Sequence, residues 1–468
     1  MVPERLAAVL AELAPVAERF EAAGHRLYLV GGTVRDFLLG RELTQDIDLT
    51  TDARPDETEA LVRPLATSVW LQGKRFGTIG GTVAGRVLEI TTHRAEAYRP
   101  DSRKPDVRFA DAVEADLSRR DFTVNAMALQ LSPEVTAGGV QLIDPFEGAA
   151  DLAAGRLRTP LDAETSFTDD PLRMLRAARF IAGYGLKPDD DLVAAVRDLH
   201  DRLEIVSAER IRDELDRLVV VEKPGPGLWF LVDTGLAAEF LPELPALALA
   251  QDPGHRHKDV LAHTVAVVER SPADRILRLA ALFHDVGKPK TRSFEPGGKV
   301  TVHHHEVVGA RMTRERMQAL RYPTDDVDAV SRLVELHLRF HGYDEGEGGW
   351  TDSAVRRYAR DAGPLLRQLN TLTRADCTTQ NRRKAAELAD RMDRLEARIA
   401  ALEEAEELAA LRPDLDGNEV MELLGLEPGP DVGRAMGYLK ELRIEQGPLG
   451  KEEAGRRLRT WWAEQPAR

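Results

Sequence analysis

The strongest constraint on the fold is a change in hydrophobic periodicity about one third of the way along the chain. The first 150 residues mix the alternation of half-buried strands with the period of amphipathic helices. From Pro171 onward nearly every segment has helical periodicity, including 171–183, 190–200 and 208–221. The sequence therefore predicts an α+β chain in which a mixed sheet with helices is followed by an all-helical remainder.

The mixed part carries the signals of a small sheet. The predicted elements are a strand at 26–30, a helix at 34–39, and strands at 46–50, 78–83 and 86–92. The last two strands are separated only by Ala84 and Gly85, which predicts a hairpin. Clusters of Pro and Gly at 223–227 and 251–254 mark boundaries further along. We expect four regions: the mixed part at 1–150, helices at 151–250, a histidine-rich helical part at 251–380 and a tail at 381–468.

Composition narrows the class of protein. At roughly 150 residues per domain, 468 residues correspond to about three domains, and 43% hydrophobic residues suffice for their cores. No run of 18 apolar residues is present, and residues 1–21 lack the pattern of an export signal. The single cysteine, Cys377, cannot form an internal disulfide. These features predict a cytoplasmic protein with no membrane segment.

The charge balance limits the kind of partner. The chain has 64 basic and 79 acidic residues, a formal net charge of −15. This balance argues against a nucleic-acid coat protein or a basic membrane binder. It remains compatible with an enzyme that holds RNA through a local basic strip.

The first chemical pattern lies between residues 29 and 52. Gly31 and Gly32 separate a strand from a helix, where backbone N–H groups and the helix N-terminus can approach a phosphate. Arg35, one turn into that helix, can clamp a polyphosphate. Asp46 and Asp48 are two apart on a strand, so both carboxylates project from one face, as a pair of Mg²⁺ ions requires.

A third acidic residue completes this pattern. Glu89 interrupts an otherwise apolar strand and could supply another carboxylate from a neighbouring strand. A lone Asp-x-Asp is usually a solvated strand end, and a lone Gly-Gly turn is weaker still. The order of strand, Gly-Gly turn, Arg-bearing helix and Asp-x-Asp strand favours phosphoryl or nucleotidyl transfer.

This order resembles the nucleotidyltransferase superfamily of polymerase-beta type, and three further stretches narrow the resemblance. They are RRDFTVNAM at 119–127, DPFEGAADL at 144–152 and DDPLRMLRAARF at 169–180. Together they resemble the motifs of the bacterial-type (class II) tRNA nucleotidyltransferase and poly(A) polymerase family. Asp169 stands where that family usually has Glu, which leaves the role of Asp169 open. The resemblance implies a nucleotidyltransferase head at 1–150, with nucleobase selection and RNA binding at 151–250.

The arginines of the last stretch recur every three residues. Arg173, Arg176 and Arg179 therefore spread over one side of a helix that follows Asp170. On a generic helix such residues form a solvated stripe with a capping Asp. A carboxylate only accepts hydrogen bonds and a guanidinium only donates them, so Asp170 and Arg173 together suit cytosine and adenine and repel uracil and guanine. The resemblance implies that this pair selects CTP and ATP.

The resemblance also assigns roles to the second stretch and to a loop. Arg120, Asp121 and Asn125 are expected to bind the ribose and triphosphate. Residues 93–105, with several basic side chains between turn formers, correspond to a mobile loop of the family. An ordinary solvated loop is an equally good interpretation of that segment.

A second pattern consists of histidines and acids. His284 and Asp285 end an apolar helix predicted at 276–286, where a buried polar pair needs a partner such as a metal ion. The order of a histidine, a His-Asp pair and a late aspartate resembles the HD phosphohydrolase domain. That resemblance implies one metal held by His263, His284, Asp285 and Asp376. His305 and His337 could hold a second metal or a substrate phosphate. Any one of these histidines is more often a hydrogen-bonded structural residue.

These resemblances imply a template-independent enzyme that adds or repairs the 3′-terminal CCA of tRNA from CTP and ATP, with Mg²⁺ at Asp46 and Asp48 and release of pyrophosphate. The acceptor end of tRNA is the expected partner, and the tail at 381–468 is an expected tRNA contact. Within the class, a poly(A) polymerase or an A-adding or CC-adding enzyme stays open. From another class, the alternative is a metal-dependent HD phosphohydrolase with a nucleotide-binding front half. The sequence leaves the oligomeric state undetermined.

Overall fold

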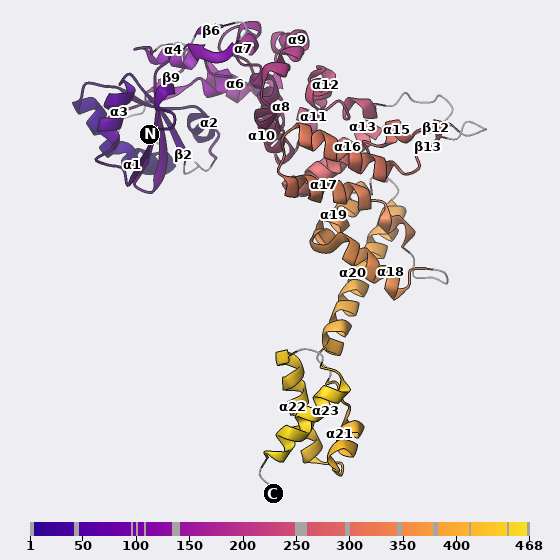
Figure 1. The fold of residues 1–468 in the computed structure, drawn as a ribbon. Helices are drawn as coiled ribbons and strands as arrows, with labels where there is room; N and C mark the ends of the chain where they lie inside the picture. Colours follow the sequence, from indigo (N-terminus) through magenta and orange to yellow (C-terminus); the bar gives the residue numbers. More distant parts are fainter. Residues whose placement is uncertain are drawn as a thin grey trace. The chain divides into compact units, whose positions relative to one another are not determined.

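The computed structural model of the chain is dominated by helices, with one large sheet near the N-terminus (Figure 1). It describes residues 4–41, 46–94, 97–99, 102–106, 109–132, 141–248, 260–294, 300–343, 349–377, 382–410, 413–446 and 449–465. Parts of the predicted loop at 93–105 and the predicted boundary at 251–254 lie outside these residues. The chain divides into two compact units, Met1–His337 and Leu338–Arg468. Each unit is described by itself.

A seven-stranded mixed sheet forms the head of the first unit. Its strand order is β3 (Ser68–Trp70), β4 (Thr78–Val83), β5 (Arg86–Thr92), β2 (Asp46–Thr51), β1 (Leu27–Val30), β8 (Ala128–Leu131) and β9 (Leu142–Ile143). Only β2 and β5 are parallel neighbours, and the other pairs are antiparallel. The predicted hairpin is confirmed as β4 and β5, which turn at Ala84 and Gly85.

Alternation along the strands gives this sheet two different faces. On one face, Leu29, Ile47 and Leu88 are fully buried in a core shared with α1 (Glu4–Ala22) and α3 (Pro55–Val62). On the other face, Tyr28 and Val30 pack against α4 (Val113–Ser118). The carboxylates of β2 project from this second face, as the alternation predicts.

Helices predominate in the rest of the first unit, which confirms the predicted change at about residue 150. The helices are α2 (Gly32–Leu38), α6 (Gly148–Ala154), α7 (Ala163–Asp169), α8 (Leu172–Tyr184), α9 (Asp190–Leu199), α10 (Ala208–Val219), α11 (Gly225–Asp233), α12 (Leu236–Phe240), α13 (Val260–Arg270), α14 (Arg275–Phe283), α15 (Lys288–Thr291), α16 (His305–Ala319) and α17 (Thr324–Leu336). Of these, α8 packs against α10 and α11, and α17 packs against α14 and α16. Three two-stranded ribbons, formed by β6 (Ala97–Arg99) and β7 (Ser102–Asp106), β10 (Arg156–Leu157) and β11 (Lys187–Pro188), and β12 (Ser293–Phe294) and β13 (Val300–Thr301), complete the described strands.

The second unit is helical throughout its described residues. Its helices are α18 (Asp352–Ala362), α19 (Leu366–Asp376), α20 (Arg382–Ala410), α21 (Gly417–Leu424), α22 (Pro430–Gln446) and α23 (Lys451–Ala463). The last three share a small core in which Val420, Leu439 and Leu458 are buried. Trp461 packs against that core and stacks on Tyr438 with ring centroids 4.4 Å apart.

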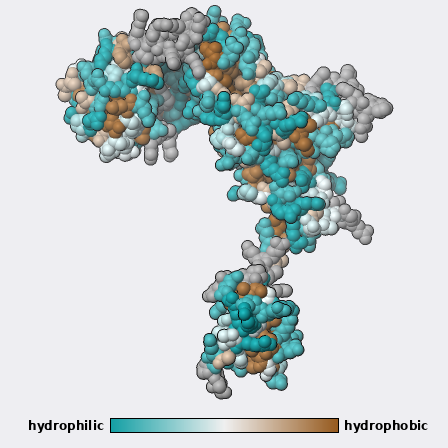
Figure 2. Space-filling model, viewed as in Figure 1, coloured by the Kyte–Doolittle hydropathy of each residue, from teal (hydrophilic) through white to brown (hydrophobic). Residues whose placement is uncertain are grey.

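The face of the molecule in Figure 2 is mostly hydrophilic, with hydrophobic residues in small separate patches. None of the helices in the described part of the chain is both long and apolar enough to cross a bilayer.

Candidate functional site

The carboxylates of the head lie together on the second face of the sheet, which also carries Tyr28 and Val30. Asp46 and Asp48 are exposed, while Ile47 between them is fully buried. In the parallel pairing of β2 with β5, Asp48 lies directly opposite Glu89, so the two side chains share one face. The structure thus brings the three predicted acids onto neighbouring strands.

The pKa values of Asp48 and Glu89 indicate that a bound cation would stabilise their charged forms. The surrounding protein removes part of the water around Asp48, and this desolvation together with the charge of Asp46 raises the pKa of Asp48, although Arg120 opposes the shift. Desolvation also raises the pKa of Glu89, and the charges of Asp48 and Asp46 add to it. Acids that disfavour their own charged forms gain from a bound cation, and oxygen ligands of this kind suit a hard divalent metal.

The glycine turn lies against these acids. Gly31 has a φ of 71°, in the left-handed region that favours glycine. A side-chain Cβ at Gly31 would lie 2.9 Å from Arg120 Nη1 and 3.6 Å from Asp48 Oδ2. The absence of a side chain therefore lets the arginine and the carboxylate both approach the turn closely.

A cavity of about 290 Å³ begins at this turn. Its lining residues are Gly31, Gly32, Asp48, Arg119, Arg120, Asp121, Asn125, Asp170, Arg173 and Arg176. The cavity therefore brings together nine of the predicted residues from four separate sequence stretches. Asp46, Glu89, Arg35 and Arg179 are not among the lining residues.

Two of the predicted arginines instead support the walls of the cavity. Arg35 is buried, and its guanidinium donates to Asn125 Oδ1 and to the carboxylate of Asp36. Arg179 donates to Glu214 of α10 at 2.8 Å. Both arginines therefore hold neighbouring elements in place.

The histidines of the second pattern converge in the same unit. His263, His284 and Asp285 have ligand atoms within 4.8 Å of one another, and so do Asp285, His305 and His337. Asp285 belongs to both groups: its Oδ2 lies 3.2 Å from His284 Nε2, and its Oδ1 lies 3.4 Å from His305 Nε2. These five residues form what we call the histidine cluster.

The backbone orients three imidazoles of the histidine cluster. The Nδ1 atoms of His284, His305 and His337 lie 2.6 to 2.9 Å from the carbonyl oxygens of Ala281, Val302 and Val334, respectively. A proton on each Nδ1 leaves the lone pair of Nε2 facing the cluster, which is the arrangement of metal-bound histidines. The Nε2 atom of His305 is buried and makes no hydrogen bond within the described structure.

Neighbouring side chains stabilise the charged form of Asp285. Burial alone would raise the pKa of Asp285, but His284, His305 and Lys288 outweigh it and hold the pKa well below its ordinary value. Asp376, the fourth ligand in the prediction, belongs to the second unit, where its carboxylate lies 4.0 Å from His341. Its membership of the metal site stays a prediction.

Comparisons with known proteins give the same order of parts. The poly A polymerase head domain matches residues 27–158, the probable RNA- and SrmB-binding site of polymerase A matches 185–247, and the HD domain matches 247–402. The chain is 35% identical to the A-adding tRNA nucleotidyltransferase of Deinococcus radiodurans, over 93% of this chain and 95% of that protein. It is 32% identical to the CC-adding tRNA nucleotidyltransferase of Thermus thermophilus, over 92% of this chain and 93% of that protein.

The chain belongs to the tRNA nucleotidyltransferase family. A solved structure of the Bacillus stearothermophilus CCA-adding enzyme in complex with CTP has the same fold, with a TM-score of 0.60 and 23% identity over 97% of this chain and 99% of that one. The resemblance found in the sequence is thereby confirmed, including the HD domain. The family consists of divalent-metal-dependent nucleotidyltransferases.

Asp116 was not among the predicted site residues of this tRNA nucleotidyltransferase. It is 1% exposed in α4, and its carboxylate accepts from Arg120 at 3.1 Å and from Arg119 at 3.4 Å. It also accepts from the backbone N–H of Arg94, where the predicted loop begins. Burial alone would raise the pKa of Asp116, but Arg120 and Arg119 outweigh it and lower the pKa. Asp116 precedes Arg120 by four residues, and this helical spacing was the sequence signal that could have predicted their contact.

The predicted base-reading pair has partners of its own. Asp170 lies at the C-terminal end of α7, and Arg210 of α10 donates to its carboxylate at 3.1 Å. Arg173 is buried and donates to Ser166 Oγ at 2.9 Å and to the carbonyl of Arg119. These contacts fix the direction of the guanidinium before a nucleotide arrives.

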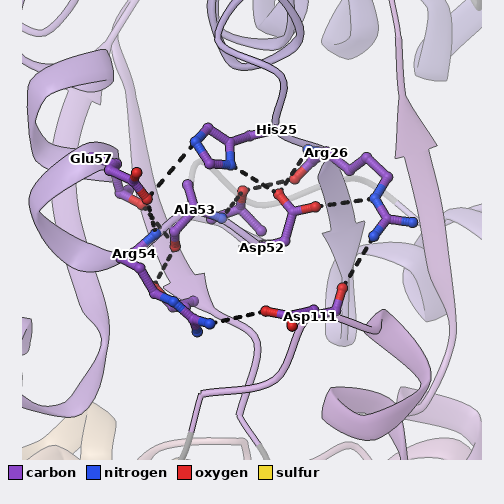
Figure 3. Close-up of polar contacts among 10 residues, drawn as sticks. His25, Arg26, Asp52, Ala53, Arg54, Glu57 and Asp111 are labelled. Atoms are coloured by element: carbon purple, nitrogen blue, oxygen red, sulfur yellow. Dashed lines mark hydrogen bonds and ion pairs between the residues drawn. The ribbon is translucent and has the colours of Figure 1, made fainter.

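A polar network secures the strand that carries the acids (Figure 3). Asp52 directly follows β2 and accepts from the backbone N–H of Arg26 at 2.9 Å and from its guanidinium at 3.1 Å. His25 Nδ1 lies 3.3 Å from the same carboxylate, and Arg54 donates to Asp111 at 2.9 Å. The C-terminal end of β2 is therefore tied to β1 and, through Arg26 and Arg54, to the segment before α4.

Proposed function

We propose that this enzyme builds or repairs the 3′-terminal CCA of tRNA from CTP and ATP, with Mg²⁺ at Asp46 and Asp48 and with release of pyrophosphate. One observation carries the proposal: a catalytic carboxylate, Asp48, and the base-reading residues Asp170 and Arg173 line the same cavity. A nucleoside triphosphate bound there meets the acids at its phosphates and the Asp–Arg pair at its base.

The residues of the head fit a divalent cation of this kind. Asp46, Asp48 and Glu89 offer hard oxygen ligands on one face. Loss of surrounding water, and to a smaller extent the neighbouring negative charges, raise the pKa values of Asp48 and Glu89. Bound Mg²⁺ would supply the charge that activates the RNA 3′-hydroxyl and neutralises the departing pyrophosphate. Arg119 and Arg120, held by Asp116, face the cavity and donate to phosphate oxygens.

Base selection follows from donors and acceptors. The Asp170 carboxylate accepts from the exocyclic amine of cytosine or adenine, and Arg173 donates to the ring nitrogen beside it. A carbonyl of uracil or guanine at the same place would face carboxylate lone pairs. An Asp170→Asn variant should therefore lose about a hundredfold of the preference for CTP over UTP, measured as the ratio of kcat/KM values.

The test of the function uses tRNA that lacks its 3′ CCA. Wild-type enzyme is incubated with CTP alone, ATP alone and both, and product lengths are read at single-nucleotide resolution. Growth by two residues with CTP and by three with both nucleotides supports the proposal, and a long oligo(A) product refutes it in favour of a poly(A) polymerase. In the same assay Asp46→Asn should lower incorporation by orders of magnitude, and near-normal incorporation would end the assignment of the acids.

The relatives favour a narrower second candidate. Two relatives that match nearly the whole chain are named A-adding and CC-adding enzymes. If this chain performs one part of the reaction, CTP alone extends tRNA and ATP adds nothing, or ATP extends only tRNA that already ends in CC. Either enzyme should hold tRNA through local Lys and Arg, so binding should weaken as salt rises.

The histidine cluster supports an accessory function. Its imidazoles and buried acid suit a divalent metal, and we expect that metal to promote hydrolysis of phosphate esters. Hydrolysis of 2′,3′-cyclic nucleotides should survive Asp48→Ala and be lost in Asp285→Ala. The reverse result would place that activity in the head.

A further inference from the structure

One row of residues crosses four strands of the head sheet. In the strand register, Asp48 of β2 lies opposite Glu89 of β5, Glu89 opposite Gly80 of β4, and Gly80 opposite Trp70 of β3. Residues directly opposite one another project from the same face, and neighbouring strands are about 4.8 Å apart. Trp70 therefore lies on the face of the catalytic acids, two strands beyond Glu89.

The indole ring of Trp70 lies closer to the acids than the distance between β3 and β5 implies, because Gly80 of β4 has no side chain. A Cβ at Gly80 would lie only 1.9 Å from Trp70 Nε1 and 2.1 Å from Trp70 Cε2. The indole thus lies across the backbone of β4, in space that any other residue at position 80 would fill. Trp70 is only partly buried, so part of the residue stays accessible to solvent.

The nucleotide cavity lies on the opposite side of the acids. It is built from Gly31 and Gly32, which follow β1, and β1 adjoins β2 on the edge away from β5. The order across the face is accordingly the nucleotide cavity, Asp48, Glu89 and then the indole of Trp70. Nucleotidyl transfer requires the attacking and leaving oxygens to be roughly in line through the reacting phosphorus. The RNA 3′-hydroxyl must therefore approach from the side of Glu89 and Trp70.

We propose that the indole of Trp70 is the platform on which the 3′-terminal nucleoside of the acceptor RNA stacks. This inference rests on the proposed function, because it assumes that an RNA end is the nucleophile. The base at that end changes after each addition, so a subsite that read it by hydrogen bonds would fail at the next step. Stacking tolerates any base, because every base has a π-face. Trp70 has an uncharged side chain that takes no part in the chemical step. Its role is to position the acceptor.

The experiment measures the contact between Trp70 and the terminal base in a double-mutant cycle. The variants are Trp70→Leu, which removes the aromatic ring, and Trp70→Phe, which keeps one. Each is assayed with an acceptor RNA that the wild type extends and with the same RNA carrying an abasic 3′-terminal nucleotide. Ser68→Ala is the matched control, because Ser68 is on the same strand and face and its hydroxyl contacts Thr82.

We expect Trp70→Leu to raise the KM for the intact acceptor about tenfold and to leave the KM for the nucleotide unchanged. Trp70→Phe should recover most of the loss, and Ser68→Ala should change neither constant. With the abasic acceptor, wild type and Trp70→Leu should have the same KM. A raised KM for the nucleotide, or an equal loss with both acceptors, would overturn the proposal.

Two measurements keep the test decisive. If Trp70→Leu lowers the melting temperature strongly, the cycle is run with Trp70→Phe and wild type, and an abasic end that binds wild type as tightly as the intact end refutes the platform. If the wild type extends no RNA under any condition, the proposed function fails. Equilibrium binding of the two RNA ends then still decides whether Trp70 contacts a terminal base.

Discussion

Two groups of acids in this enzyme stand in opposite electrostatic settings. In the head, Asp46, Asp48 and Glu89 are exposed and crowded, and the pKa values of Asp48 and Glu89 are raised. In the histidine cluster, Asp285 is 1% exposed, yet His284, His305 and Lys288 hold its pKa well below the ordinary value. The folded protein therefore disfavours the charged forms of Asp48 and Glu89, whereas it stabilises the charged form of Asp285. An acidic residue therefore identifies a metal site only together with its surroundings.

The largest effect that separates the two groups is expected from Asp48→Asn. Nucleotide incorporation should fall by about three orders of magnitude, because a proposed ligand of the catalytic metal is lost. Stability should not fall: a raised pKa means that the folded state disfavours the charged form, so charged Asp48 lowers stability at neutral pH. Thermal melting of the metal-free protein checks this, and a clear loss of melting temperature would contradict it.

The opposite pattern is expected from Asp285→Asn. Removing a buried, paired charge should lower the free energy of unfolding by about 3 kcal/mol, while addition of nucleotides to RNA continues. Urea denaturation and the incorporation assay measure the two outcomes. Asp328→Asn is the control, because its ion pair with Arg314 is exposed and contributes at most about 1 kcal/mol. Equal destabilisation by Asp285→Asn and Asp328→Asn would show that the buried charge of Asp285 does not stabilise the fold more than an exposed ion pair.

Asp116→Asn sharpens the comparison within the head. Loss of this buried charge frees Arg119 and Arg120, so the KM for CTP should rise about tenfold with a smaller change in kcat. Steady-state kinetics with saturating RNA measure the split. Glu114→Gln, on the same helix, should leave both constants near wild type. A fall in kcat with an unchanged KM would mean that Asp116 acts on the chemical step.

The smallest effect is expected from Asp52→Asn. Burial alone would raise the pKa of Asp52, but its bonds to Arg26 outweigh it and lower the pKa, so the charged form stabilises the fold. The variant should be less stable by about 1 kcal/mol at pH 7. Since a lowered pKa contributes stability that is lost as pH falls through the folded value, the difference should shrink below about pH 4. Unfolding curves at pH 7 and pH 3 check this, and a constant difference would refute it.

The amino-acid sequence by itself determined the local features of this protein. Alternation placed Asp46 and Asp48 on one face of a strand, and helical periodicity placed α8 and α10 close to their predicted bounds. The reason is that strand and helix periods are set by backbone geometry over a few residues. The family resemblance came from short motifs of the same local kind.

Only the tertiary structure decided which of these residues meet. It placed Arg119 in the cavity lined by Asp48 and Asp170 and left Arg35 and Arg179 out of its lining, although all three arginines lie within or beside predicted motifs. It also paired Asp170 with Arg210, 40 residues away, and laid Trp70 across Gly80 beside the acids. Such contacts depend on how helices and strands pack and on which face of a sheet stays open. No short-range periodicity encodes them, because the partners are brought together by burial of surface elsewhere in the fold.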